Sequence, residues 1–135
     1  MASQNIETKY LALSANGTPI RVDGTDTTTP TQIHDPGVVT DEHVDACYIR
    51  VHNPTAGRIT LYVLWNPVAG DATSLDKATL TFKIEAYGEV VVADGERMGL
   101  THRASHVAIE MYVATTDVDE LIVRGWVDRI TQTGT

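Results

Sequence analysis

Histidine is the residue type in this chain best suited to metal or acid–base chemistry. The five histidines are His34, His43, His52, His102 and His106. His102 and His106 have the spacing of two ligands on one helical turn, but their surroundings alternate as a strand does. On a strand, residues four apart lie about 13 Å from each other, too far to share one ion unaided. We therefore predict no metal site and expect exposed or structurally hydrogen-bonded histidines.

Carboxylates and serines offer no stronger signature. The acidic groups are Asp41-Glu42, Asp71 with Asp76, and Asp117 with Asp119 and Glu120. None has the D-x-[DN]-x-[DN]-G spacing of a calcium loop, so we expect solvated loop charge. Ser105 adjoins His106 without a G-x-S-x-G turn, and no glycine-rich phosphate loop is present. A carboxylate pair for glycoside cleavage stays open, because folding could bring any two together. We predict no catalytic, cofactor-binding or metal-binding residue, no cofactor, and a non-enzyme.

Aromatic residues form the remaining candidate site. Tyr62, Trp65, Tyr112 and Trp126 stand on strand-like segments, and Tyr62, Tyr112 and Trp126 are predicted to share an outward face with Arg124 or Arg50. Such a face could stack sugars or bury itself against a second subunit. Packing within the protein is the third interpretation, and the sequence leaves all three open.

Length and charge narrow the class of protein. The chain has 135 residues, enough for one domain. Ten lysines and arginines stand against eighteen acidic residues, a net charge of −8, and the basic residues are scattered. We therefore expect no nucleic-acid partner. No signal peptide or membrane span is predicted, which places synthesis in a cytosol. The single cysteine, Cys47, is expected to be buried and inert.

The segment 44–67 has the clearest local pattern. Cys47, Ile49 and Val51 alternate with polar residues, and a second alternating run covers residues 59–66. Residues 53–57 (NPTAG) between the two runs are typical of a turn. The pattern predicts a β-hairpin that forms the scaffold of the domain.

Further short strands are predicted over residues 79–85, 89–93, 107–113 and 121–130. Their apolar residues alternate, and no 3.6-residue period is sustained. Gly125 inside the last run indicates a bulge or a close backbone approach. Short strands separated by turns predict an all-β protein, an antiparallel β-sandwich or jelly roll.

Residues 1–43 differ from the rest of the chain. They hold short apolar runs at 9–13 and 19–22 between turns rich in Gly, Pro, Asp and Thr. We predict an extended N-terminal arm over 1–43 and a β-sandwich domain over 44–135. The arm could pack along the domain, reach another chain or be partly disordered.

The order of these features resembles that of a known class of proteins. An HNPTAGRITLYVLWNP turn and strand precede TLTFKIEA, then ADGERMGL, then a strand after Ala104-Ser105-His106, and finally TDVDELIVRGWVDRI. Over about residues 44–130 this is similar to small β-sandwich virion proteins of tailed bacteriophages, such as capsid decoration or head-spike and fibre-base proteins. The resemblance rests on strand order and turn placement, and no functional residue is carried over from it.

The resemblance implies a structural role on a phage capsid or gene-transfer-type particle. It implies a homo-oligomer, with a trimer favoured, that contacts the major capsid protein or other virion proteins. The N-terminal arm would add a strand to a neighbouring sheet edge. The protein would be located in the virion after assembly in the host cytoplasm. The alternative hypothesis is a carbohydrate-binding β-sandwich that uses the aromatic residues named above.

Overall fold

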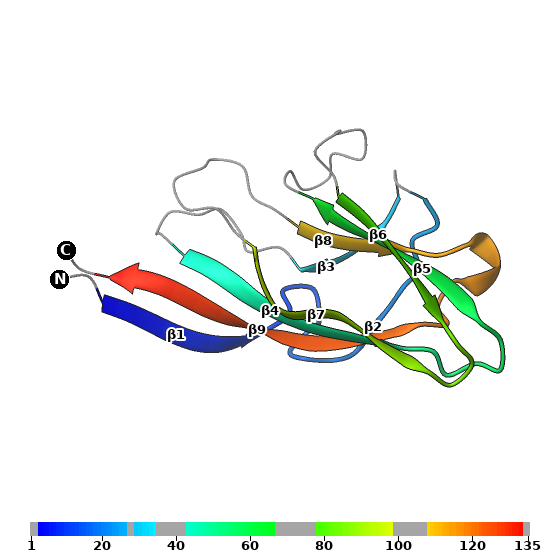
Figure 1. Cartoon of the computed structure of the whole chain (residues 1–135), viewed down its shortest axis with the longest axis horizontal. Coiled ribbons are helices and arrows are strands. Elements are labelled where there is room, and N and C mark those ends of the chain that lie inside the picture. Colours follow the sequence, from blue (N-terminus) through cyan, green and yellow to red (C-terminus); the bar gives the residue numbers. More distant parts are fainter. Residues whose placement is uncertain (1–2, 27–28, 35–42, 67–77, 99–107, 134–135) are drawn as a thin grey trace.

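The protein is an all-β sandwich, as predicted. The computed structural model describes residues 3–26, 29–34, 43–66, 78–98 and 108–133. These residues form nine strands and one short 3-10 turn, η1 (Thr115–Asp117), and no α-helix occurs among them. The strands build two antiparallel sheets that face each other (Figure 1).

The first sheet has the strand order β1-β9-β4-β7. Its strands are β1 (Ser3–Tyr10), β9 (Ile122–Thr133), β4 (His43–His52) and β7 (Glu89–Met98). The short β2 (Ile20–Arg21) pairs with the start of β9, and β1 pairs with the remainder of β9.

The second sheet has the order β3-β8-β5-β6. Its strands are β3 (Thr31–His34), β8 (Ala108–Tyr112), β5 (Ile59–Asn66) and β6 (Ala78–Ile84). From β2 onward the chain changes sheet at every connection except the one between β5 and β6. Apart from β1, which is added beside β9, strands β2 to β9 form two four-stranded sheets that are connected as in a jelly roll.

The predicted hairpin over 44–67 is wrong. β4 lies in the first sheet and pairs with β7 and β9, whereas β5 lies in the second sheet and pairs with β6 and β8. The turn between them is an arch that carries the chain across the sandwich. The apolar faces of β4 and β5 therefore meet across the core instead of lying side by side. Alternation reports which face of a strand is buried and carries no information about its neighbour.

Asn53 holds this arch closed. Its buried Nδ2 donates to the carbonyl oxygens of Gly57 (2.7 Å), Ile84 (3.0 Å) and Glu85 (3.2 Å). Ile84 ends β6 and Glu85 begins the second arch, between β6 and β7, whose Gly88 carbonyl accepts from the Asn53 backbone N–H at 2.8 Å. Because one side chain satisfies groups of both arches, it fixes both crossings at the same end of the sandwich.

Alternating residues fill the space between the sheets, as the sequence predicts. Ile49 and Val51 of β4 and Leu61 and Val63 of β5 are fully buried. Each such side chain contributes about 1.5–3 kcal/mol relative to an exposed one. Cys47 is also fully buried, which confirms the expected buried thiol. Burial first, and the charges of Asp45 and Glu96 next, raise the pKa of Cys47 to about 12.

Gly125 marks a close backbone approach inside β9. A Cβ atom at this position would lie 2.1 Å from the carbonyl oxygen of Tyr48 and 3.1 Å from the Cα atom of Ile49. The register between β4 and β9 is continuous through Gly125, so no bulge forms there. Of the two predicted explanations, the close approach is the observed one.

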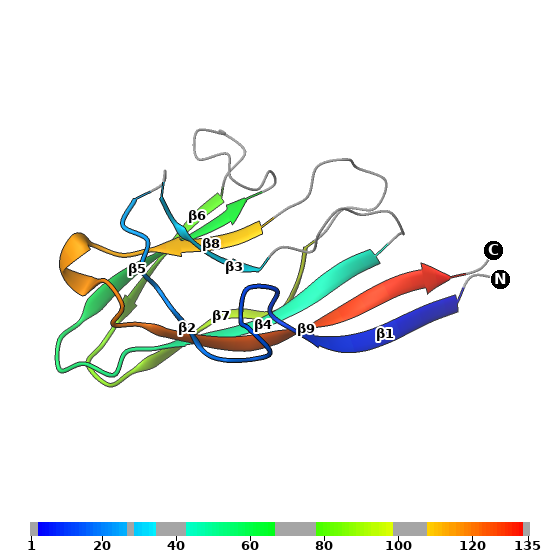
Figure 2. The same ribbon diagram turned by 180° about the vertical axis from the view of Figure 1, so that it is seen from behind.

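The strands before residue 43 lie along the rest of the protein. β1 pairs with β9 from Ser3↔Thr133 to Tyr10↔Trp126, and β3 pairs with β8. Of the alternatives for residues 1–43, these strands therefore follow the first: they pack along the domain. The predicted division between 43 and 44 falls at the first residues of β4. β1 and the C-terminal half of β9 extend beyond the end of the second sheet (Figure 2).

Candidate interaction surface

Three aromatic side chains form a row across the outer face of the first sheet. Tyr10 of β1 pairs in register with Trp126 of β9, and Trp126 pairs with Tyr48 of β4. Tyr48 and Trp126 stack, with ring centroids 5.1 Å apart and an interplanar angle of 12°. Both residues point outward because they alternate with the buried Cys47 and Val127. We call these three residues the aromatic row.

Much of the aromatic row remains accessible to solvent. Tyr10 is 62% exposed and Trp126 is 45% exposed. Ile6, which lies on the same face of β1 as Tyr10, is also 62% exposed. Large apolar side chains exposed together mark interaction surfaces, because their burial against a partner releases ordered water. The row is therefore a candidate contact surface.

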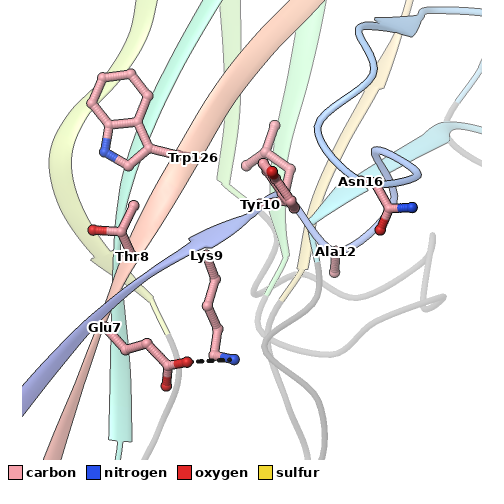
Figure 3. A pocket seen from close by; sticks show the side chains of 8 residues that line it. Glu7, Thr8, Lys9, Tyr10, Ala12, Asn16 and Trp126 are labelled. Carbon is pink, nitrogen blue, oxygen red and sulfur yellow. Dashed lines mark ion pairs between the residues drawn. The ribbon is translucent and has the colours of Figure 1, made fainter.

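An open groove of about 660 Å³ runs along β1 beside this row. It is lined by Glu7, Thr8, Lys9, Tyr10, Leu11, Ala12, Asn16 and Trp126. Figure 3 shows Glu7, Thr8, Lys9 and Tyr10 along β1, Asn16 on the loop that follows it, and Trp126 on the neighbouring strand. Lys9 and Glu7 form an ion pair at 3.4 Å on the exposed strand.

The loop after β1 braces Tyr10. Gly17 has a φ of 88°, and a Cβ atom there would lie 2.8 Å from the Tyr10 ring, so only glycine allows this contact. Ser14 fixes the loop, because its Oγ donates to the Leu11 carbonyl at 2.8 Å and accepts from the Gly17 N–H at 3.0 Å. One face of the Tyr10 ring is thereby held against the loop while the residue stays exposed.

Two arginines adjoin the aromatic row. Arg50 and Arg124 are directly opposite each other in the β4–β9 register, two residues from Tyr48 and Trp126. Both are exposed, and Arg50 reaches Glu89 at 3.4 Å. A small groove of about 120 Å³ includes both arginines and both stacked rings. Asp94 also lines this groove and Arg50 is paired with Glu89, so Arg124 is the cation that, among the described residues, has no ion-pair partner and could meet an anionic group.

The predicted common face of Tyr62, Tyr112 and Trp126 is wrong. Tyr62 and Tyr112 are cross-strand neighbours on the second sheet, whereas Trp126 lies on the first. The two tyrosine rings stack on each other, with centroids 4.7 Å apart and an interplanar angle of 13°. Burial first, then the charges of Tyr62 and Asp26, raise the pKa of Tyr112. The side chain of Trp65 lies outside the described residues.

A buried ionic cluster that no sequence motif predicts lies at the opposite end of β4 from Asn53. Asp45 accepts from Arg129 at Oδ1 (2.8 Å, from Nε) and at Oδ2 (3.0 Å, from Nη2). Its Oδ2 also lies 2.8 Å from Nε2 of His34. Burial alone would raise the pKa of Asp45, but the hydrogen bond from His34 and those from Arg129 outweigh burial and hold the pKa at about 2. Asp45 is therefore ionised at neutral pH.

The geometry of this cluster is that of a structural contact between strands and not that of a catalytic pair. His34 Nδ1 accepts from the Ala12 backbone N–H at 3.0 Å, which leaves Nε2 as the protonated nitrogen that donates to Asp45. Both ring nitrogens are thus occupied, and His34 and Asp45 are 1% and 0% exposed. A general base needs a free nitrogen that reaches the substrate, so His34 cannot serve as one here.

The other sequence candidates divide into two groups. His102, His106, Ser105 and the acidic residues at 41–42, 71 and 76 lie outside the described residues. Asp117, Asp119 and Glu120 lie in the turn after β8, and within the described ranges no three His, Cys, Asp or Glu side chains are placed to hold a metal ion. No helix in the described part is long and apolar enough to cross a membrane.

No protein-family model matches this chain, and no curated protein matches it. The resemblance to phage virion proteins thus stays a prediction. A jelly roll supports many unrelated functions, so function has to be argued from the surface.

Proposed function

We propose that this protein is a non-enzymatic structural component of a tailed-bacteriophage or gene-transfer-type particle. In this role it decorates the capsid or seats a spike on it, and it is located in the virion after assembly in the host cytoplasm. Its partners are further copies of itself and the major capsid protein or other virion proteins. The observation that carries the proposal is the exposed aromatic row on a sandwich whose buried ionisable cluster is fully engaged in structural contacts.

The aromatic row supplies the kind of contact that such a role needs. Stable protein interfaces combine a buried aromatic anchor with a polar rim. Trp126 and Tyr10 would be the anchor, while Thr8 and Asp128 lie beside them on the same face of β1 and β9. The rings are already positioned by the Tyr48 stack and by Gly17, so little side-chain freedom is lost on binding.

A binding experiment with particles tests this role. Particles of the phage or prophage that encodes the chain, prepared without this protein, are mixed with the purified full chain and sedimented. We expect co-sedimentation, and we expect Trp126→Ala to weaken it at least tenfold. Tyr87→Asn is the matched control, because Tyr87 is 67% exposed on the arch between β6 and β7. Failure of the unmodified chain to bind would refute the proposal.

Carbohydrate binding is the second candidate, favoured by one observation. Trp126 and Tyr48 lie beside Arg50 and Arg124 in one groove, an arrangement suited to a sugar that carries a carboxylate or sulfate group. Tyr62 and Tyr112 do not contribute, because each ring covers a face of the other. A glycan array decides the matter: binding of acidic glycans that is lost in Arg124→Ala favours this candidate, and an array without hits removes it.

A further inference from the structure

β1 is a free edge of the first sheet. Among the described strands it pairs with β9 alone, over eight residues and with no register shift. The opposite edge strand, β7, has two register shifts against β4. Bulges of this kind discourage further strand pairing, whereas a regular edge offers unpaired N–H and C=O groups to another strand.

The sequence of β1 is complementary to itself in the antiparallel direction. With Thr8 opposite Thr8 of a second copy, Glu7 faces Lys9 of that copy and Lys9 faces its Glu7. In the same register Ile6 faces Tyr10 of the second copy, and Tyr10 faces Ile6. Opposite charges and aromatic–β-branched pairs are both favourable cross-strand neighbours.

We propose that two copies of this chain associate through antiparallel pairing of β1, with the two-fold axis at Thr8. The two first sheets then form one continuous sheet, and Ile6 and Tyr10, each 62% exposed in the single chain, become covered. The partner's Ile6 extends the aromatic row beyond Tyr10 on the same face. The interface is isologous, as two-fold symmetry requires.

The charges identify a second copy as the occupant of this edge. β6, the regular edge strand of the second sheet, also pairs without a register shift, yet Lys83 is its one charged residue. Antiparallel self-pairing of β6 therefore brings no opposite charges together in any register. In β1, by contrast, a second copy satisfies the charges of both Glu7 and Lys9 in a single register, so the strand carries its own complement.

This inference goes beyond the proposed function and does not depend on it. The resemblance to virion proteins implies a trimer, whereas a two-fold contact through β1 gives a dimer. Sedimentation equilibrium of the full chain over a range of concentrations measures the mass directly. We expect a reversible monomer–dimer equilibrium. A purely monomeric or trimeric chain would overturn the inference, and particle binding would still be open to its own test.

Charge reversal tests the register. Glu7→Lys and Lys9→Glu each place like charges opposite each other, and we expect each variant alone to weaken dimerisation at least tenfold. In a mixed dimer of the two variants, both cross-strand pairs again join opposite charges, so mixing should restore association. Lys83→Glu on β6 is the control and should leave the dimer unchanged. Dimerisation that persists in both single variants, or that mixing does not restore, contradicts the proposed register.

A cross-link provides a test that does not depend on charge. Thr8→Cys places two thiols opposite each other at the two-fold axis, so mild oxidation should link the chains efficiently. Cys47 does not compete, because it is fully buried. Thr81→Cys on the exposed edge strand β6 is the control. Equal cross-linking of both variants would count against pairing through β1.

Discussion

The two ends of β4 bury polar groups by different means. At one end the neutral amide of Asn53 binds backbone carbonyls of two arches. At the other end ionised Asp45 is held by His34 and Arg129. We call these the amide end and the ionic end.

The difference decides how each end responds to its surroundings. At the amide end, the bonds of the Asn53 side chain join its amide to backbone groups and to the Thr55 hydroxyl, and they close two crossings between the sheets. The ionic end joins three strands, β3, β4 and β9, and Arg129 is the register partner of Glu7 on the free edge β1. We therefore expect the amide end to set basal stability and the ionic end to make stability depend on pH.

The largest expected effect is at the amide end. Asn53→Asp keeps the shape of the side chain but removes three donated hydrogen bonds and places a carboxylate among three carbonyl oxygens. We expect a loss of about 3–5 kcal/mol in the free energy of unfolding, measured by urea denaturation. Asn5→Asp, the same change at an exposed position, should be nearly neutral. Equal stability of the two variants would mean that Asn53 does not fasten the arches.

A smaller loss is expected at the ionic end. Asp45→Ala leaves His34 and Arg129 without their common acceptor. Breaking a buried ion pair costs about 3–5 kcal/mol, and we expect about 3 kcal/mol because the Arg129 side chain is 25% exposed and can regain water. Glu120→Ala, an exposed carboxylate in the turn before β9, is the control. A loss no greater than in the control would contradict a stabilising role for the cluster.

Lowering the pH should reduce the stability that the ionic end contributes and leave the contribution of the Asn53 amide unchanged. The pKa of Asp45 is about 2 in the folded protein and 3.8 in its ordinary state. The unfolded chain therefore binds this proton first as pH falls, so the stabilisation is complete above pH 3.8 and is lost as pH falls through 2. The contribution is about 2 kcal/mol. Urea denaturation between pH 5 and 2 should show this decline, and Asp45→Asn should reduce it by that amount. An equal decline in both proteins would exclude Asp45 as its source.

The fold class and the buried faces are readable from sequence because they depend on local alternation. Ile49, Val51, Leu61 and Val63 occupy the core positions that their period of two predicts. The neighbours of each strand are not local information. The arch at residues 53–57 has the composition of a hairpin turn, and the deciding bonds join Asn53 to carbonyls 31 and 32 residues away.

The candidate surface was predictable only in part, for the same reason. The sequence predicts Trp126 as an outward aromatic residue, but its partners depend on which strands flank β9. The alternation of β4 predicts that Tyr48 points outward. It does not predict that Tyr48 lies beside Trp126 instead of beside Tyr62, because that depends on which strands pair. Asp45 and Arg129 are 84 residues apart and carry no motif, so their ion pair follows from the register between β4 and β9.

The smallest expected effect concerns an ion pair on the surface of the amide end. Arg58 and Glu85 join the two arches at 2.9 Å, next to the bonds of Asn53, but their side chains are 56% and 67% exposed. Water screens such a pair, so a double-mutant cycle with Arg58→Ala and Glu85→Ala should give a coupling of about 0.5 kcal/mol or less. The coupling should fall further in about 1 M salt. A coupling as large as that between Asp45 and Arg129 would show that charge, and not the Asn53 amide, holds the arches together.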